Sequence, residues 1–161
     1  MNRAISKPAR RGLCCILVLL TETSDLTAAP GAWTDLGGGT LRDNETGLQW
    51  TQEDNGQDVT WKDAKRFCAD KRGGWRLPRV EELQALYMGA SSHRETTPCG
   101  ASTCRAPELF RLSSSWFWSS TQAGTEKDDG LPDVWGVLLV NGARTSTLAD
   151  IAFGSRTLCV R

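Results

Sequence analysis

The chain has 161 residues, with 19 basic and 19 acidic side chains, a single histidine, six cysteines and seven tryptophans. This balanced charge gives no overall attraction to nucleic acid or to an anionic membrane, so the composition does not support a nucleic-acid partner. About 130 residues remain once the N-terminal leader is set aside, which is the usual size of one domain with a single core.

Residues 1–29 have the pattern of a secretory signal peptide, because four basic residues precede the apolar run 13–20 and Ala28 and Ala29 follow it. The run is far shorter than the ~20 residues that cross a bilayer, which disfavours an uncleaved anchor. Cys14 and Cys15 begin the run, whereas a lipidated cysteine would follow it. We therefore expect a protein that is exported to the periplasm or the extracellular space, with 30–161 as one domain and no transmembrane segment in the mature chain. Without the leader, 15 basic and 17 acidic residues remain.

The mature chain keeps four cysteines, Cys68, Cys99, Cys104 and Cys159. Four cysteines allow three pairings, and an exported chain meets an oxidising compartment in which disulfides form. Cys99 and Cys104 are close enough to close a small loop, which would leave Cys68 to join Cys159. Zinc is the alternative use of four cysteines, but paired C-x-x-C spacings are absent.

The first expected elements are a β-hairpin and a helix. Apolar and polar residues alternate over 39–52 around a polar turn at 43–47, so the hairpin would bury Leu41, Leu48 and Trp50. The helix begins after Thr60, which can cap it, and Gly73–Gly74 end it. Its core face would hold Trp61, Ala64, Phe67 and Cys68.

A second helix is expected after Pro78, with Glu81 and Glu82 in its first turn, where the helix dipole favours negative charge. Its apolar face would hold Leu83, Leu86 and Tyr87. Arg79 stands where Ser or Thr would cap the helix better. The stretch 89–115 is rich in Ser, Thr, Gly and Pro, and a loop of this length is usually functional or poorly ordered. Strands are expected at 115–121, 133–142 and 155–161, with a tight turn at Asn141–Gly142, so the order of elements is α+β.

Six segments resemble, in the same order, the bacterial Lcl C-terminal domain family: GTLRDNETGLQW, WKDAKRFCAD, GGWRLPRVEEL, WFWSST, VWGVLLVNG and the terminal LCVR. The resemblance covers about 38–161. It implies a C-type-lectin-like fold, shared with formylglycine-generating proteins, in which two helices flank twisted antiparallel sheets and Cys68 bonds to Cys159. The family is named for the end of a collagen-like adhesin, which implies a recognition role by analogy. Arg79 and the segment 88–115, with its own cysteine pair, depart from the family pattern.

The step Trp75-Arg76-Leu77-Pro78 fits a structural role better than a binding role. A guanidinium beside indoles can stack and donate to carbonyls, and a proline at a helix entrance loses no hydrogen bond. Arg76 could instead bind a carboxylate or sulfate, but its neighbours are apolar. Tryptophans spaced through helices and strands are more often core than sugar-stacking platforms, and we assign the same structural role to the remaining motif residues Trp50, Trp61, Trp118, Ser119 and Ser120.

The chain offers weak candidates for catalysis and metal binding. A serine nucleophile in 113–115 or 119–120 would need a base, and the only histidine, His93, lies in the long loop without a matching motif. Formylglycine-type oxidation would need free cysteines. Asp128, Asp129 and Asp133 form an acidic turn that is a weak calcium candidate, but Leu131 stands where related lectins carry a Glu or Gln oxygen, which favours a solvated turn. We therefore expect no cofactor and no enzyme activity.

The remaining candidate is a basic patch, formed by Lys62, Lys65, Arg66, Lys71 and Arg72. It could bind a sulfated glycan or another polyanion, and the alternative is a solvated helix face. The first hypothesis is an exported, non-enzymatic recognition or adhesion module that binds a glycan, or an envelope or host protein. The second is an envelope assembly partner without glycan binding, and the third is an enzyme of the formylglycine-generating type.

Overall fold

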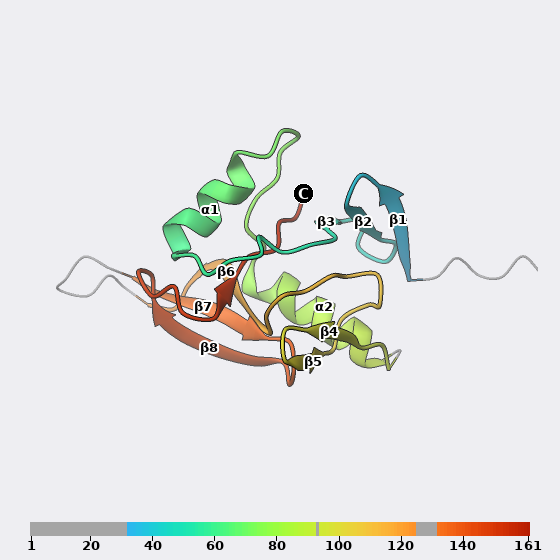
Figure 1. Ribbon diagram of the computed structural model, residues 1–161. Helices are drawn as coiled ribbons and strands as arrows, with labels where there is room; N and C mark the ends of the chain where they lie inside the picture. The colour runs from blue at the N-terminus through green and yellow to red at the C-terminus, as the bar shows by residue number, and fades with distance from the viewer. Residues whose placement is uncertain (1–31, 93, 125–131) are drawn as a thin grey trace, which may run out of the picture.

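The computed structural model describes residues 32–92, 94–124 and 132–161, which form an α+β fold with two helices and three small sheets (Figure 1). The α+β class expected from the sequence is confirmed. In the part of the chain that the structure describes, neither helix has the length and apolar character needed to cross a bilayer.

The first sheet is antiparallel, with strand order β1-β2-β3. Strands β2 (Thr40–Asp43) and β3 (Gln49–Thr51) are the predicted hairpin, and Leu41 lies opposite Trp50 with both side chains buried. The sequence analysis missed β1 (Trp33–Gly37), which pairs with β2. Four of its five residues are exposed, so it lacks the alternation by which strands are recognised.

Helix α1 (Trp61–Ala69) begins as predicted, with the Thr60 side chain accepting a hydrogen bond from the Asp63 backbone N–H. The helix ends at Ala69 rather than at the glycine pair. Gly73 and Gly74 instead form the turn that follows, where both residues have positive φ, 101° and 78°. A side chain would strain the backbone at both positions.

Helix α2 (Val80–Ser92) packs against β6 and β7 through its predicted apolar face. Its cap differs from the sequence-based expectation that Arg79 weakens it. The Val80 N–H donates to the Thr121 hydroxyl at 3.1 Å, and the Arg79 N–H donates to the Glu82 carboxylate at 2.7 Å. A strand residue 41 positions away therefore supplies the oxygen that Arg79 lacks.

The stretch expected to be a long loop is partly built into the core. Strands β4 (Thr97–Cys99) and β5 (Ser102–Cys104) form a hairpin closed by the Cys99–Cys104 disulfide. Phe110 and Leu112 from the following segment are buried in the main hydrophobic cluster beside α2. Part of the segment therefore packs in the core rather than forming a free loop.

The largest sheet has the order β8-β7-β6-β9, formed by Trp116–Gln122 (β6), Asp133–Leu138 (β7), Ala143–Leu148 (β8) and Ser155–Arg156 (β9). Strand β8 follows the predicted Asn141–Gly142 turn but was not itself predicted. The sheets are antiparallel as expected except at one place, where β9 pairs with β6 in parallel. The predicted last strand also stops at Arg156.

The last residues of the chain tie the first sheet to the start of α2. Val160 bridges both Trp50 and Arg76, with Arg76 and Val160 exchanging backbone hydrogen bonds of 2.9 Å. The Cys68–Cys159 disulfide joins α1 to the same segment. A second hydrophobic cluster forms here, between α1 and the large sheet, and includes Trp61, Trp118 and Val134. The two disulfides join the partners that the sequence analysis favoured.

Candidate functional site

The Trp75–Pro78 step is bonded to the first turn of α2 through Arg76. Arg76 forms a bidentate ion pair with Glu82, with N–O distances of 2.8 and 2.7 Å. The Glu82 side chain is only 8% exposed. Burial opposes ionisation of Glu82, but the hydrogen bonds from Arg76 and Arg79 outweigh it and lower the pKa of Glu82 to about 2. The Glu82 hydrogen bond likewise raises the pKa of Arg76. Arg76 is therefore engaged within the protein. The guanidinium that stacks on Trp75 is that of Arg161, at 4.6 Å.

The other motif residues are buried or hydrogen-bonded within the fold. Trp50 and Trp118 are buried, and the indole N–H groups of Trp61 and Trp118 donate at 2.8 Å to the carbonyls of Ser119 and Val59. The Ser119 hydroxyl donates to the Trp135 carbonyl at 2.6 Å, and the Ser120 N–H donates to the Pro78 carbonyl at 2.7 Å. Leu77 and Pro78 are buried. The buried indole N–H of Trp50 has no hydrogen-bond partner, whereas the indole N–H groups of Trp61 and Trp118 are bonded inside the fold.

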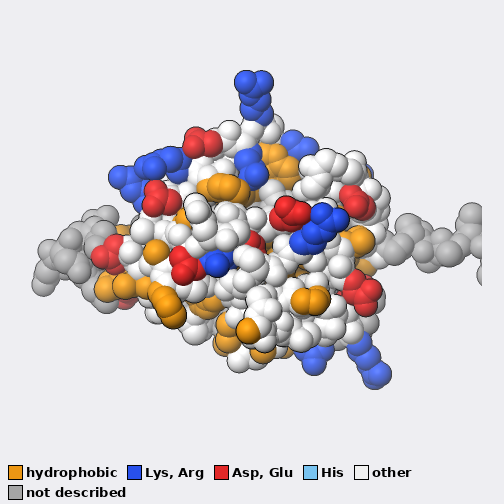
Figure 2. Space-filling view, in the orientation of Figure 1, with side chains coloured by type: hydrophobic (Ala, Val, Ile, Leu, Met, Phe, Trp, Pro, Cys, Tyr) orange, Lys and Arg blue, Asp and Glu red, His pale blue; other side chains and the backbone are white. Residues whose placement is uncertain are grey.

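The basic patch lies on the outward side of α1 and in the turn after it. Lys62, Lys65, Arg66 and Arg72 are exposed and Lys71 is half-buried. In Figure 2, blue side chains gather at the upper left of the molecule, beside α1. The Lys65 ammonium lies 3.4 Å from the centroid of the Trp61 ring, and the Lys71 ammonium lies 4.5 Å from that of Phe67. These ring contacts hold two of the cations in place.

A cavity of about 510 Å³ opens beside the first turn of α1. Trp61, Pro132 and Ala149 provide its apolar wall, and Lys62, Lys65 and Asp150 bring charge to it, with Thr60 completing the lining. Its volume lies in the range typical of small-ligand pockets, and its lining combines apolar surface with a few charged groups, as such pockets do.

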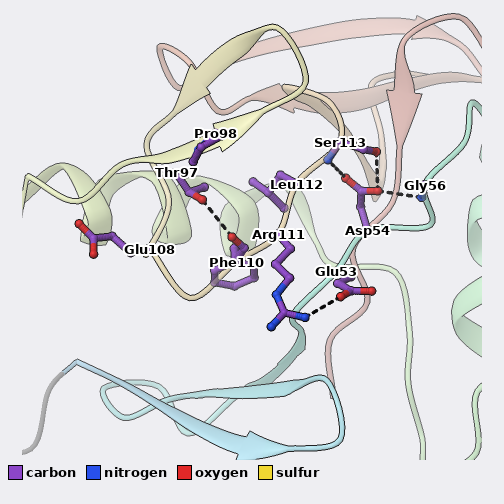
Figure 3. Close-up of a pocket in the computed structure, with 10 residues that line it drawn as sticks. All are labelled: Glu53, Asp54, Gly56, Thr97, Pro98, Glu108, Phe110, Arg111, Leu112 and Ser113. Atoms are coloured by element: carbon purple, nitrogen blue, oxygen red, sulfur yellow. Dashed lines mark hydrogen bonds and ion pairs between the residues drawn. The ribbon is translucent and has the colours of Figure 1, made fainter.

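A second concavity, a shallow groove of about 590 Å³, lies between residues 53–56 and the segment 97–113 (Figure 3). Asp54 points at Ser113 and receives its N–H and its hydroxyl at 2.6 and 2.7 Å, while Arg111 reaches across to Glu53 at 3.0 Å. Glu108 lies at the far end of the groove from Asp54. The polar groups of this groove mostly satisfy one another.

Among the candidate serine nucleophiles, Ser113 contacts a carboxylate, that of Asp54, and the described residues place no histidine beside any of them. The Ser113 hydroxyl donates to Asp54 and accepts from Arg156 Nε at 3.0 Å, and the Ser114 hydroxyl donates to the Gly154 carbonyl at 2.9 Å. His93 lies outside the described residues. All four cysteines of the described chain are in disulfides, so none of these is the free thiol that formylglycine-type chemistry needs.

No cluster of metal-ligating side chains occurs within residues 32–92, 94–124 and 132–161. The calcium candidate falls largely beyond those ranges, because Asp128 and Asp129 are outside them. Asp133 is described, half-buried at the start of β7, where its carbonyl accepts from the Ala123 N–H at 2.7 Å. The solvated acidic turn, with calcium binding as its weaker alternative, stays a prediction.

Residues 39–161 match the Lcl C-terminal domain family along their whole length. The chain belongs to this family. The match confirms the resemblance carried by the six sequence segments. The helices, the disulfides and the cavity beside α1 all lie within the matched residues. No curated protein matches the sequence.

Several solved structures are distantly similar to this Lcl C-terminal domain. Botrocetin has a TM-score of 0.42 and 13% identity, covering 83% of this chain and 98% of its own. EMS16, an antagonist of collagen receptor integrin α2β1, has a TM-score of 0.40 and 12% identity, covering 82% and 98%. Rhodocetin has a TM-score of 0.41 and 13% identity, covering 83% and 96%. At this distance the ligand of the domain has to be argued from its own surface.

Three features of the domain were not predicted from the sequence. The cavity beside α1 joins residues about 90 positions apart, and no local pattern marks such a pairing. The role of Glu82 could have been found, because a Glu at the third position of a helix accepts from the backbone N–H of the N-cap residue in a capping box, and here that residue is Arg79. The apolar side chains of the connection between β8 and β9 were overlooked because the segment has no periodicity.

Proposed function

We propose that the protein is an exported, non-enzymatic recognition module with a C-type-lectin-like fold, whose unit is the mature chain 30–161. It binds a polyanionic ligand, and a sulfated glycan is our first choice. The binding surface is the basic patch on α1 and the turn after it, consisting of Lys62, Lys65, Arg66, Lys71 and Arg72.

The observation that carries this proposal is that few cations of the patch are paired with a carboxylate. Among the described residues, Arg66 alone of the five cations forms an ion pair, with Asp63 at 3.1 Å, and that pair is well exposed. Arg76 and Arg79, which follow in sequence, are by contrast committed to Glu82. The surface therefore keeps a local positive charge although the mature chain has a slight negative excess.

The ring contacts of Lys65 and Lys71 add to this argument. A lysine side chain loses substantial rotamer freedom when it binds a ligand, and an ammonium that already rests on an aromatic face has less freedom to lose. An ammonium over a ring still has N–H groups directed outward, which can donate to sulfate or carboxylate oxygens.

Export and the absence of catalysis are supported by the cysteines. Both disulfides are buried, and one closes a loop of 91 residues, as in proteins that mature in an oxidising compartment. These cysteines are bonded, and the hydroxyls of Ser113, Ser114 and Ser119 donate to Asp54 and to backbone carbonyls, which argues against a nucleophilic role for these groups.

The test is binding of the oxidised protein to immobilised heparin and to neutral glycans over a series of salt concentrations. We expect binding to heparin that weakens with salt, because counterion release drives such association. Lys62→Ala with Lys65→Ala, and Lys71→Ala with Arg72→Ala, should each lower the affinity about tenfold and reduce the salt slope by roughly one for each contact removed.

The matched control is Arg42→Ala with Arg105→Ala, which removes two exposed cations outside the patch and should leave heparin binding unchanged. Equal losses in patch and control variants would mean that net charge alone acts. Binding of neutral sugars that requires calcium would favour the acidic turn 128–133 instead. Absence of all glycan binding would favour a protein partner in the envelope or on a host surface, and assembly rather than adhesion.

A further inference from the structure

The connection between β8 and β9 exposes apolar side chains to solvent. Phe153 is 91% exposed and Ile151 is 42% exposed, although both are large apolar residues. A single exposed apolar side chain is ordinary on a protein surface. A phenylalanine with nearly its whole surface in water, two residues from an exposed isoleucine, instead indicates a surface that contacts another molecule.

Hydrogen bonds hold this connection in a defined shape. At its two ends, the backbone N–H of Trp61 donates to the Ala149 carbonyl at 2.9 Å, and the backbone N–H of Val59 donates to the Ser155 carbonyl at 3.1 Å. Within it, the Ser155 N–H donates to the Ala152 carbonyl, and the Ser114 hydroxyl donates to Gly154. The residues between Ala149 and Ser155 are thus held at both ends by bonds to the segment that enters α1. The exposure of Phe153 therefore results from the fold.

The same anchors place the connection beside the cavity at the first turn of α1. Ala149 and Asp150 line that cavity together with Lys62 and Lys65, and Ile151 follows directly. In Figure 2, orange side chains gather at the lower left, where Figure 1 draws this connection, and the blue side chains beside α1 lie above them. We define the apolar–basic face as Lys62 and Lys65, which line the cavity, together with Ile151 and Phe153, which follow the lining residue Asp150 in the chain.

Acidic groups near the apolar–basic face are partly neutralised. Asp58 is paired with Arg156, and Asp63 is paired with Arg66. Asp150 lines the cavity and is exposed. Among the described residues, two ammonium groups and one exposed carboxylate thus line the cavity, which gives this described part of the face a positive balance.

We infer that the apolar–basic face docks the protein on an anionic lipid surface, with Phe153 and Ile151 entering the headgroup region and Lys62 and Lys65 on lipid phosphates. A protruding phenylalanine needs a matching pocket on a protein partner, whereas a lipid interface accepts it without one. Lysines beside exposed aromatic and aliphatic side chains are the pattern of interfacial binding, in which apolar insertion and charge attraction add. The cavity, with its apolar wall, would accept the first part of an acyl chain.

This inference goes beyond glycan recognition and is separable from it. The two lysines are shared with the basic patch, but Phe153 and Ile151 carry no charge and have no part in binding a polyanion. Loss of the apolar side chains should therefore affect lipid docking and leave heparin binding intact.

The experiment is co-sedimentation of the oxidised protein with phosphatidylcholine vesicles, with and without phosphatidylglycerol. We expect binding only when phosphatidylglycerol is present. Ile151→Ser with Phe153→Ser should lower the partition coefficient about tenfold or more, and Lys62→Ala with Lys65→Ala should do the same. The matched control is Met88→Ser, which removes an exposed apolar side chain on α2, 63% exposed, and should change nothing.

Heparin binding by the serine variant serves as its folding control, and it should equal that of the unmodified protein. Absence of vesicle binding by a protein that binds heparin would overturn the lipid assignment and keep the proposed function. Vesicle binding that the serine substitutions leave unchanged would also overturn it, since charge alone would then act. Self-association in sedimentation velocity that is lost in the serine variant, without vesicle binding, would assign the face to a second copy of the chain and overturn the inference.

Discussion

Replacing Glu82 by glutamine tests whether the buried ion pair stabilises the junction between the Trp75–Pro78 step and α2. The amide keeps the shape of the side chain and an oxygen that can accept from the Arg79 N–H, but it removes the negative charge that Arg76 and Arg79 contact. The substitution therefore isolates the electrostatic part of the interaction from the helix cap.

The magnitude follows from the pKa of Glu82. Its fall from an ordinary value of 4.5 to about 2 corresponds, at about 1.4 kcal/mol for each pH unit, to roughly 3 kcal/mol of stability at neutral pH. The Arg76 and Arg79 side chains are 45% and 67% exposed, so solvent screens part of this attraction. We expect Glu82→Gln to lower the free energy of unfolding by about 2 kcal/mol.

The pH dependence has a definite sign. Because the folded-state pKa of Glu82 lies below its unfolded-state value, the carboxylate stabilises the fold fully above about pH 4.5 and loses this effect as the pH falls towards 2. Urea unfolding at neutral pH and at steps down to pH 3 should therefore show the difference between the two proteins shrinking.

The matched control is Glu81→Gln in the same helical turn. Glu81 is 62% exposed and lies 3.7 Å from Arg144, so its loss should change the free energy of unfolding by less than about 0.5 kcal/mol. Equal effects of the two substitutions, or a difference between Glu82→Gln and the unmodified protein that does not change with pH, would refute the reasoning.

Three further predictions concern stability. Thr121→Val removes the oxygen that caps Val80 and should cost about 1 kcal/mol in urea unfolding, and no loss would mean that water caps the helix equally well. Gly136→Ala should cost about 1–3 kcal/mol, because the added methyl group would overlap the indole packed on it from β6, and an unchanged midpoint would contradict this close packing. Replacing the Cys68–Cys159 pair by alanines should lower the free energy of unfolding by about 4–5 kcal/mol, against about 2 kcal/mol for the Cys99–Cys104 pair. The reason is that the first bond closes a loop of 91 residues and the second a loop of 5. The reverse order in thermal unfolding would refute the entropic account.

The Thr60 cap, the apolar spacing of α1 and α2 and the β2–β3 hairpin were all predictable from the sequence. Each depends on interactions between residues a few positions apart, such as Thr60 with Asp63 or Leu41 with Trp50. The family could also be recognised, because its segments occur in a fixed order. These features are local or collinear, and a sequence displays both directly.

The pairing partners that complete the fold were decided only by the tertiary structure. Thr121 caps a helix 41 positions earlier, and Val160 bridges both Trp50 and Arg76. The segment 97–112 could be read as a loop because nothing nearby in sequence shows that Phe110 would be buried beside α2. The apolar–basic face likewise exists only because β9 returns to the entrance of α1. Sequence periodicity records which side of an element is apolar, whereas the choice of what covers that side depends on contacts between distant residues, which form only when the chain has folded.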